Sequence, residues 1–140
     1  MSEGRRSKVR GFMQLRVWQE AIELYRTLRP HFQSWAFMDQ RVASNAIAAC
    51  DSVHRNIAEG YARRSIREYR NFLNIAMGSL GETVSGLHAY LGSGQSDRDE
   101  FEDLDARCLK LENWLINLVA SLERKQRDGS WDEEFSGGRD

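Results

Sequence analysis

The sequence predicts an all-α protein, an antiparallel up-and-down four-helix bundle with a disordered C-terminal tail. Apolar residues recur at steps of three and four in four successive segments, which is the spacing of one helix face. One proline and 29% charged residues are typical of long helices with solvent-facing sides. Short polar or glycine-containing segments separate the apolar patterns, so consecutive helices are expected to lie antiparallel.

The helices are expected near residues 14–29, 39–59, 65–91 and 97–125, within a bundle that spans 12–127. A basic, flexible arm (1–11) precedes the bundle, and an acidic, glycine-containing tail (128–140), expected to be disordered, follows it. Four apolar stripes, one from each helix, are expected to form the core. They are Leu15, Trp18, Ile22 and Tyr25; Ala43, Ile47, Cys50, Val53 and Ile57; Tyr69, Leu73, Ala76, Leu80, Thr83, Leu87 and Tyr90; and Phe101, Leu104, Cys108, Leu111, Leu115, Leu118 and Leu122.

Local signals indicate where the helices begin and end. Pro30 lacks an N–H donor, so the first helix is expected to end or bend just before it. Gly60 is expected to follow the second helix with a positive φ, which glycine adopts at little steric cost. Ser65 and Glu68 have the spacing of a capping box for the third helix, and Asp97 begins an acidic first turn for the fourth.

The charge balance excludes a broadly basic chain. Lys and Arg number 20 and Asp and Glu number 21, a formal net charge of −1, so the surface as a whole does not attract phosphate. Cys50 and Cys108 are too few for a disulfide framework and lie in apolar patterns, which favours reduced thiols in the core. No apolar run has the length of a signal peptide or a membrane span, so we expect a cytoplasmic protein.

A catalytic site or a cofactor finds no support in the sequence. His31, His54 and His88 lie in three different segments, and the motifs of phosphate-binding loops and di-iron bundles do not occur. Cys50 and His54 are four residues apart and suit one face of a helix, but a zinc site needs three or four ligands. We therefore expect no enzyme activity, no metal, no cofactor and no small-molecule substrate.

Five arginines gather around the expected junction of the second and third helices, where only Glu59 and Glu68 oppose them. They are Arg55, Arg63, Arg64, Arg67 and Arg70. The planar guanidinium suits phosphate, so these residues are candidates for binding a nucleic acid or a protein partner. A solvated helix face with weak ion pairs is the alternative.

Two further features favour contacts between copies of the chain. More apolar surface exists than one stripe per helix can bury, for example at Ile75 and Ile116, so we expect self-association. A broad core stripe is the alternative. An acidic start of the fourth helix has a charge that complements the arginines of another subunit and would set the register between subunits; it contains Asp97, Asp99, Glu100, Glu102, Asp103 and Asp105.

The block NIAEG at 56–60, followed by RRS at 63–65 and IAMGSL at 75–80, resembles the four-helix-bundle proteins encoded within intervening sequences of bacterial 23S rRNA genes. The segment LRVWQEA at 15–21 is similar to the first helix of that family. The similarity spans roughly residues 12–125, and the paired blocks at this separation are more specific than either block alone.

The resemblance implies an antiparallel bundle that assembles as a ring, typically a homopentamer. The chain is also similar to the accessory protein of diversity-generating retroelements, which works with a reverse transcriptase and nucleic acid. We therefore expect a non-enzymatic homo-oligomeric scaffold or adaptor that binds structured RNA or a nucleic-acid-handling protein through the arginine-bearing surface. The alternative is a self-assembling protein-interaction module that binds no nucleic acid.

The motif residues have structural explanations of their own. Asn56 suits a hydrogen bond to nearby backbone or a neighbouring helix, Glu59 suits a pair with Arg63, Gly60 permits a turn, and Gly78 and Ser79 permit close packing of the third helix. The chain departs from the family pattern at Asn45, Ile47 and Ala48, where members often have Gln followed by an Arg pair, and at Met77, where a basic residue is common. These departures weaken any inherited phosphate contact.

Overall fold

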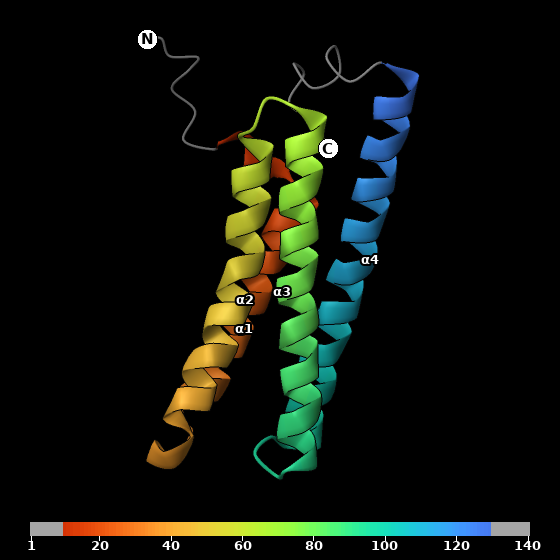
Figure 1. Ribbon diagram of the computed structural model, residues 1–140. Coiled ribbons are helices and arrows are strands. Elements are labelled where there is room, and N and C mark those ends of the chain that lie inside the picture. Colours follow the sequence, from red (N-terminus) through yellow and green to blue (C-terminus); the bar gives the residue numbers. More distant parts are fainter. Residues whose placement is uncertain (1–9, 130–140) are drawn as a thin grey trace.

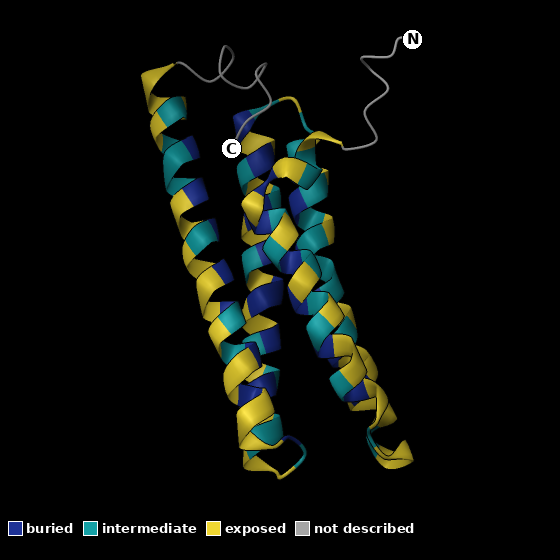
Figure 2. Cartoon of the chain, turned by 180° about the vertical axis from the view of Figure 1, so that it is seen from behind, coloured by how far each residue is buried: buried dark blue, intermediate teal, exposed yellow. Residues whose placement is uncertain are grey.

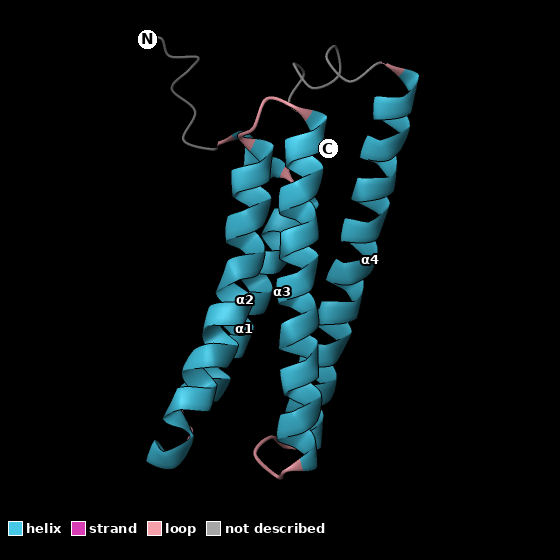
Figure 3. Ribbon diagram, viewed as in Figure 1, coloured by secondary structure: helices cyan, strands magenta, loops and turns pink. Residues whose placement is uncertain are grey.

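Four α-helices that run alternately up and down make up the computed structural model, which describes residues 10–129 (Figure 1). Their bounds are α1 (Arg16–Gln33), α2 (Gln40–Tyr61), α3 (Ile66–Gly92) and α4 (Arg98–Asp128), and two short 3-10 helices precede α1 and α2, namely η2 (Gly11–Gln14) and η3 (Phe37–Asp39). Figure 3 shows only helices and loops in this part of the chain. The predicted fold class is confirmed, whereas most of the predicted arm and tail lie outside the described residues.

The up-and-down course brings distant segments together at the two ends of the bundle (Figure 1). At one end lie η2, the turn 62–65 between α2 and α3, and the last turns of α4. At the other end lie the corner between α1 and α2 and the loop between α3 and α4. No helix in the described ranges combines the length and hydropathy needed to cross a membrane.

Aliphatic side chains from all four helices form one continuous core, and Figure 2 shows their buried positions along the inner sides of the helices. All seven residues of the predicted α4 stripe are buried. The α3 stripe is buried except at Tyr90, and the α2 stripe except at Ile47; both of these residues pack partly buried against the core. Each large aliphatic side chain contributes about 1.5–3 kcal/mol through its burial, so this column holds the bundle together.

The predicted stripe of α1 is wrong except at Leu15, just before the helix. Trp18, Ile22 and Tyr25 are only half-buried, and the buried face of α1 consists instead of Val17, Ala21, Leu24, Leu28 and Phe32. The ring of Tyr25 packs edge-to-face against the ring of His54 on α2, with 6.1 Å between the two centroids. The three expected residues therefore flank the core, because bulky apolar side chains can cover its edge while their outer surfaces remain in water.

Pro30 does not end α1, which continues to Gln33. A proline inside a helix costs about 3 kcal/mol because it removes a hydrogen bond and crowds the preceding turn. The residues beyond it are held by tertiary contacts that offset this cost. Phe32 is buried and packs against Trp35 and Tyr90, with ring centroids 4.6 and 5.5 Å apart, and His31 bonds to residues at the start of α4.

Gly60 lies inside α2, where positive φ was expected after its end. The reason for glycine is the close approach of α3. A Cβ atom built on Gly60 would lie 2.8 Å from Phe72 Cβ and 3.1 Å from Tyr69 Cδ1. By contrast, a Cβ at Gly78 or Gly81 would meet nothing within 4 Å, so the expected close packing at Gly78 does not occur within the described chain.

The predicted starts of α3 and α4 are confirmed. Ser65 Oγ accepts a hydrogen bond from the Glu68 N–H at 3.1 Å, and Asp97 Oδ1 accepts one from the Glu100 N–H at 2.9 Å. These side chains satisfy amide groups that have no partner in the first helical turn. Gly129 ends α4 with φ +73°, the left-handed conformation that glycine favours there.

Substituting Gly60→Ala is expected to destabilise the protein by about 1–3 kcal/mol, because the added methyl group overlaps Phe72 and the α3 backbone must move. Gly81→Ala is the matched control and is expected to stabilise α3 by about 0.5–1 kcal/mol, since it adds helix propensity without a clash. Chemical denaturation of both variants measures the two changes. Equal effects of the same sign would contradict the close contact at Gly60.

Candidate nucleic-acid interface

The two family-like blocks meet across the contact between α2 and α3. Ser79 Oγ donates to Ser52 Oγ at 2.8 Å, which joins α3 to α2. Asn56 Nδ2 donates to both the carbonyl oxygen and Oγ of Ser52, each at 2.9 Å. Ser79 is buried, so this small network satisfies polar groups inside the seam. The structural roles predicted for Asn56 and Ser79 are thereby explained, although Ser52, which links them, was not predicted.

Two of the five candidate arginines support the bundle. Arg63 donates to Glu59 at 2.6 Å, as the sequence predicts, and its guanidinium carbon lies 4.8 Å from the centroid of the Phe72 ring. Arg70 bridges α3 and α4, since it donates to Glu123 and to Gln126, both at 2.7 Å. Their charges are therefore already partly satisfied within the protein.

The other three candidates have solvent-exposed side chains. Arg55 lies 3.7 Å from Asp51 in a weak, exposed i,i+4 pair. Arg64 lies in the turn after α2 and Arg67 in the first turn of α3, and among residues 10–129 neither makes an ion pair or a hydrogen bond. Arg64 and Arg67 are thus the candidates best placed to bind an external anion.

The fold adds cations that sequence reasoning did not assign to this cluster. The last turns of α4, which carry Arg124, Lys125 and Arg127, lie at the same end of the bundle as the α2–α3 turn (Figure 1). The predicted topology could have revealed these cations, because an up-and-down bundle places the end of its fourth helix at the same end as the turn between its second and third helices. We call this the basic end; it comprises Arg63, Arg64, Arg67, Arg124, Lys125 and Arg127.

Acidic residues occupy the opposite end of the bundle. We call it the acidic end; it comprises Asp39, Asp97, Asp99, Glu100, Glu102 and Asp103. Some of this charge is compensated, because Arg98 lies 3.7 Å from Glu102 and Arg107 lies 3.4 Å from Asp103. Acidic residues also lie at the basic end, namely Glu59, Glu68, Glu123 and Asp128, so the charges of the chain are only partly separated along the bundle axis.

At the acidic end, the fold brings together Ser96, His31 and Glu100. His31 Nε2 lies 2.9 Å from Ser96 Oγ, and its Nδ1 lies 2.9 Å from Glu100 Oε1, which is the order of a nucleophile, a base and an orienting acid. Ser96 is buried, however, and the Glu100 N–H is already bound by the Asp97 carboxylate, whereas acyl transfer needs free donors for the oxyanion. The arrangement suits a latch between α1 and the α3–α4 loop.

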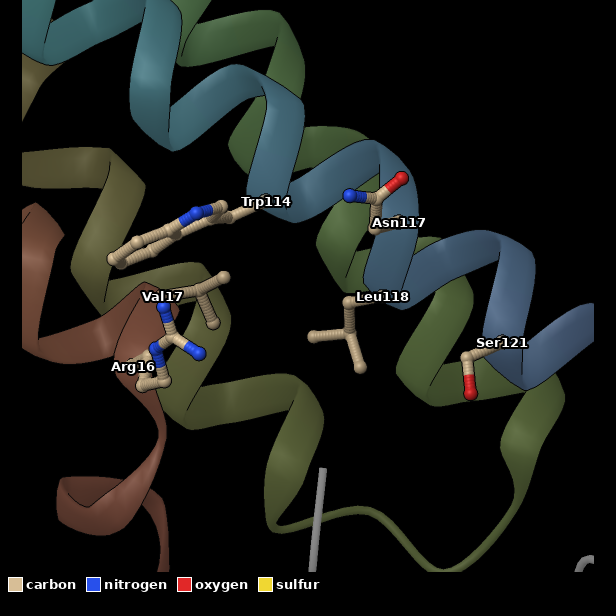
Figure 4. Close-up of a pocket in the computed structure, with 6 residues that line it drawn as sticks. All are labelled: Arg16, Val17, Trp114, Asn117, Leu118 and Ser121. Carbon is tan, nitrogen blue, oxygen red and sulfur yellow. The ribbon is translucent and has the colours of Figure 1, made fainter.

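A hollow of about 450 Å³ separates the beginning of α1 from the second half of α4 (Figure 4). The Arg16 guanidinium carbon lies 4.4 Å from the centroid of a Trp114 ring, and Lys110 Nζ lies 5.2 Å from it. Asn117 and Ser121 line the α4 side of the hollow, as Figure 4 shows. The cation–π contact of Arg16 with Trp114 joins α1 to α4, whereas that of Lys110 lies within α4.

The thiols and His54 form no metal-binding group. Burial raises the pKa of Cys50 and of Cys108 to about 12, so both thiols are protonated at neutral pH and inert. His54 Nε2 lies 2.9 Å from Asp51 Oδ1 on the surface of α2. Within residues 10–129, no three His, Cys, Asp or Glu side chains are grouped so that they could hold a metal ion.

Asp97 is expected to make stability depend on pH in the acid range. Its hydrogen bond from the Glu100 backbone lowers its pKa below the ordinary 3.8, so its contribution is complete above that value and is lost as the pH falls through the lower folded value. Asn also caps helices but does not titrate. The difference in Tm between the wild type and Asp97→Asn should therefore shrink as the pH falls below 3.8. Glu102→Gln is the control for loss of charge, and parallel Tm profiles for wild type and Asp97→Asn would contradict the assignment.

The comparisons with known proteins agree with this architecture. Residues 13–117 match the family model of the 23S rRNA-intervening sequence protein. The fold is similar to the crystal structure of a protein with unknown function from the S23 ribosomal protein family of Bacteroides thetaiotaomicron, with 21% identity and a TM-score of 0.65 over 74% of this chain and 97% of that one. A comparison with curated proteins found no match. Because the family model covers most of the chain, this protein belongs to the 23S rRNA-intervening sequence protein family.

Proposed function

We propose that the protein is a non-enzymatic, homo-oligomeric scaffold or adaptor in the cytoplasm that binds structured RNA through its basic end. The observation that carries this proposal is the position of Arg64 and Arg67. Both side chains are exposed, neither is engaged by a described residue, and they lie at the same end of the bundle as the cations at the end of α4 (Figure 1). Guanidinium groups placed in this way suit the phosphates of a folded nucleic acid.

The family supports RNA as the first ligand to test, since its name refers to 23S rRNA. A local cluster of cations is enough to contact phosphates, so binding of RNA does not require a net positive charge on the whole chain. The residues of the acidic end lie more than a Debye length away in the direction of the helix axes, so salt screens them from a ligand at the basic end. Of the acidic residues near the ligand, Glu59 and Glu123 are paired with Arg63 and Arg70. Binding by this surface is expected to depend on shape and phosphate spacing more than on base sequence.

The absence of catalysis is supported by what the polar groups already do. Ser96, which bonds to His31, is buried and so shielded from a substrate, and the buried thiols remain protonated at neutral pH. The polar atoms of the seam between α2 and α3 bond to one another. These groups hold elements together and offer no activated nucleophile to a substrate.

Self-association is supported by apolar side chains that the single chain leaves in water. Ile75 on α3 and Leu109 and Ile116 on α4 each expose half or more of their surface. Contact with other copies would bury this surface, and the resemblance noted above favours a pentamer. The same residues favour a second candidate function, a protein-interaction module that self-assembles and binds no RNA.

The double substitution Arg64→Ala/Arg67→Ala is expected to weaken binding of structured bacterial ribosomal RNA fragments and to flatten its dependence on salt. Each lost phosphate contact lowers the slope of log affinity against log salt by about 0.7–0.9. Fluorescence anisotropy at several salt concentrations measures both effects. The matched control is Arg26→Ala/Arg98→Ala, which removes two exposed arginines outside the basic end and should change the slope less.

Saturable binding that persists at physiological salt and exceeds binding to an unrelated RNA would support the adaptor function. Equal losses in the two double variants would contradict the assignment to the basic end. If the wild-type protein binds RNA only at low salt, the attraction is generic. The protein-interaction module would then be the better account, and light scattering would still test its self-association.

A further inference from the structure

The corner between α1 and α2 presents two large apolar side chains to water. Phe37 is 92% exposed and Met38 is 85% exposed, and both lie in η3 at the acidic end. The next ring inward, Trp35, is fixed, because its centroid lies 4.6 Å from Phe32 and 5.0 Å from Tyr90. A rigid base therefore carries an apolar projection (Figure 2 shows this corner as exposed), and burial of both side chains would be favourable.

The surroundings of this projection are acidic. Between the corner and the start of α4 lies a hollow of about 350 Å³, lined by the carboxylates of Asp39, Asp97 and Glu100 together with Trp35. The partner that covers Phe37 and Met38 must therefore combine an apolar cavity with positive charge, since a second acidic surface would be repelled.

The other end of the same molecule has these properties. A hollow of about 480 Å³ lies between the beginning of the chain and the end of α2. Its apolar lining is Phe12, Met13, Trp18, Ala58 and Ala62, and its polar lining is His54, Arg55 and Glu59. The Glu59 carboxylate is paired with Arg63 at 2.6 Å. Arg63 and Arg64 follow Ala62 directly in the chain, so the hollow adjoins the basic end.

We propose that the acidic end of one copy docks on the basic end of a second copy, with Phe37 and Met38 seated in the hollow beside Ala58 and Ala62. The contact joins two different surfaces, so it is heterologous, and a docked pair leaves one acidic end and one basic end available for further copies. Opposite charges set the orientation, and burial of the apolar pair supplies the affinity. In a side-by-side ring of copies, the same contact would join rings end to end.

End-to-end docking covers part of the basic end and therefore competes with RNA. The contact itself does not depend on RNA binding, because its two surfaces belong to the protein alone. Purified protein without nucleic acid is thus expected to associate further as its concentration rises. This growth is expected to weaken at high salt, since the Debye length falls from about 8 Å at 0.15 M to about 3 Å at 1 M.

Two complementary double variants test the proposal by light scattering behind a sizing column. Phe37→Ser/Met38→Ser removes the projection and leaves the hollow intact. Ala62→Glu/Arg64→Glu places negative charge in and beside the hollow and leaves the projection intact. All four residues are exposed, so circular dichroism melts are expected to show that both variants fold like the wild type.

Each variant alone is expected to lose the concentration-dependent growth. Mixed in equal amounts, the two variants are expected to double the mass of the assembly that each forms alone, and then to stop. In the mixture, only Ala62→Glu/Arg64→Glu has an intact projection, and only Phe37→Ser/Met38→Ser has an intact hollow. One kind of junction can therefore form, and no further copy can be added beyond it. Doubling followed by arrest identifies a head-to-tail contact, which an interface between two identical surfaces cannot produce.

The control is Leu109→Ser/Ile116→Ser, which removes two exposed apolar side chains of α4. Neither residue lines either of the two hollows. It is expected to retain end-to-end growth, whether or not it changes side-by-side assembly. The proposal is overturned if the wild-type protein shows no such growth, if Phe37→Ser/Met38→Ser grows like the wild type, or if the mixture gains no mass. Any of these three results would overturn the proposal, even if RNA or another protein were found to dock on one of the ends.

Discussion

The close contact between α2 and α3 is the constraint on which the rest of the structure depends. Gly60 lets the α3 side chains Tyr69 and Phe72 approach the α2 backbone, and the hydrogen bond between Ser52 and Ser79 satisfies polar groups within the same seam. The turn between these helices carries Arg64, and its geometry follows from how tightly the two helices pack. Gly60, Ser52 and Ser79 therefore help to position the basic end although they lie within the seam.

Partial separation of charge along the bundle axis is the second organising feature. Each helix contributes its ends to both poles, so no single segment of the sequence displays the pattern completely. Ion pairs across helices, such as Arg70 with Glu123, use part of the charge to hold the bundle together. The remaining charge is available for contacts outside the chain. It lies at Arg64 and Arg67 at the basic end and around Asp39 and Asp99 at the acidic end. A protein with almost no net charge can in this way offer a phosphate-binding surface.

The sequence predicted elements well where one physical signal dominated. The α4 stripe was predicted completely because its apolar residues, five of them leucines, keep an uninterrupted helical spacing, and the caps at Ser65 and Asp97 follow from local hydrogen bonding. Errors arose where tertiary contacts outweighed local preference, as in the continuation of α1 through Pro30 and the helical conformation of Gly60.

For the candidate site, the sequence identified the arginines but not their different roles. Arg63 and Arg70 are engaged by Glu59 and Glu123, whereas Arg64 is not, and only the fold shows this difference. The latch of His31 with Ser96 joins residues 65 positions apart, so no spacing rule could reveal it. The cations at the end of α4 required the topology as well.

The most direct test of the account is to map where RNA contacts the protein. RNA cross-linked to the wild-type chain by ultraviolet light can be located by mass spectrometry of the digested complex. The account predicts cross-linked peptides from the turn 62–65, the first turn of α3 and the last turns of α4. Cross-links concentrated at the corner between α1 and α2, or spread evenly over the four helices, would contradict it.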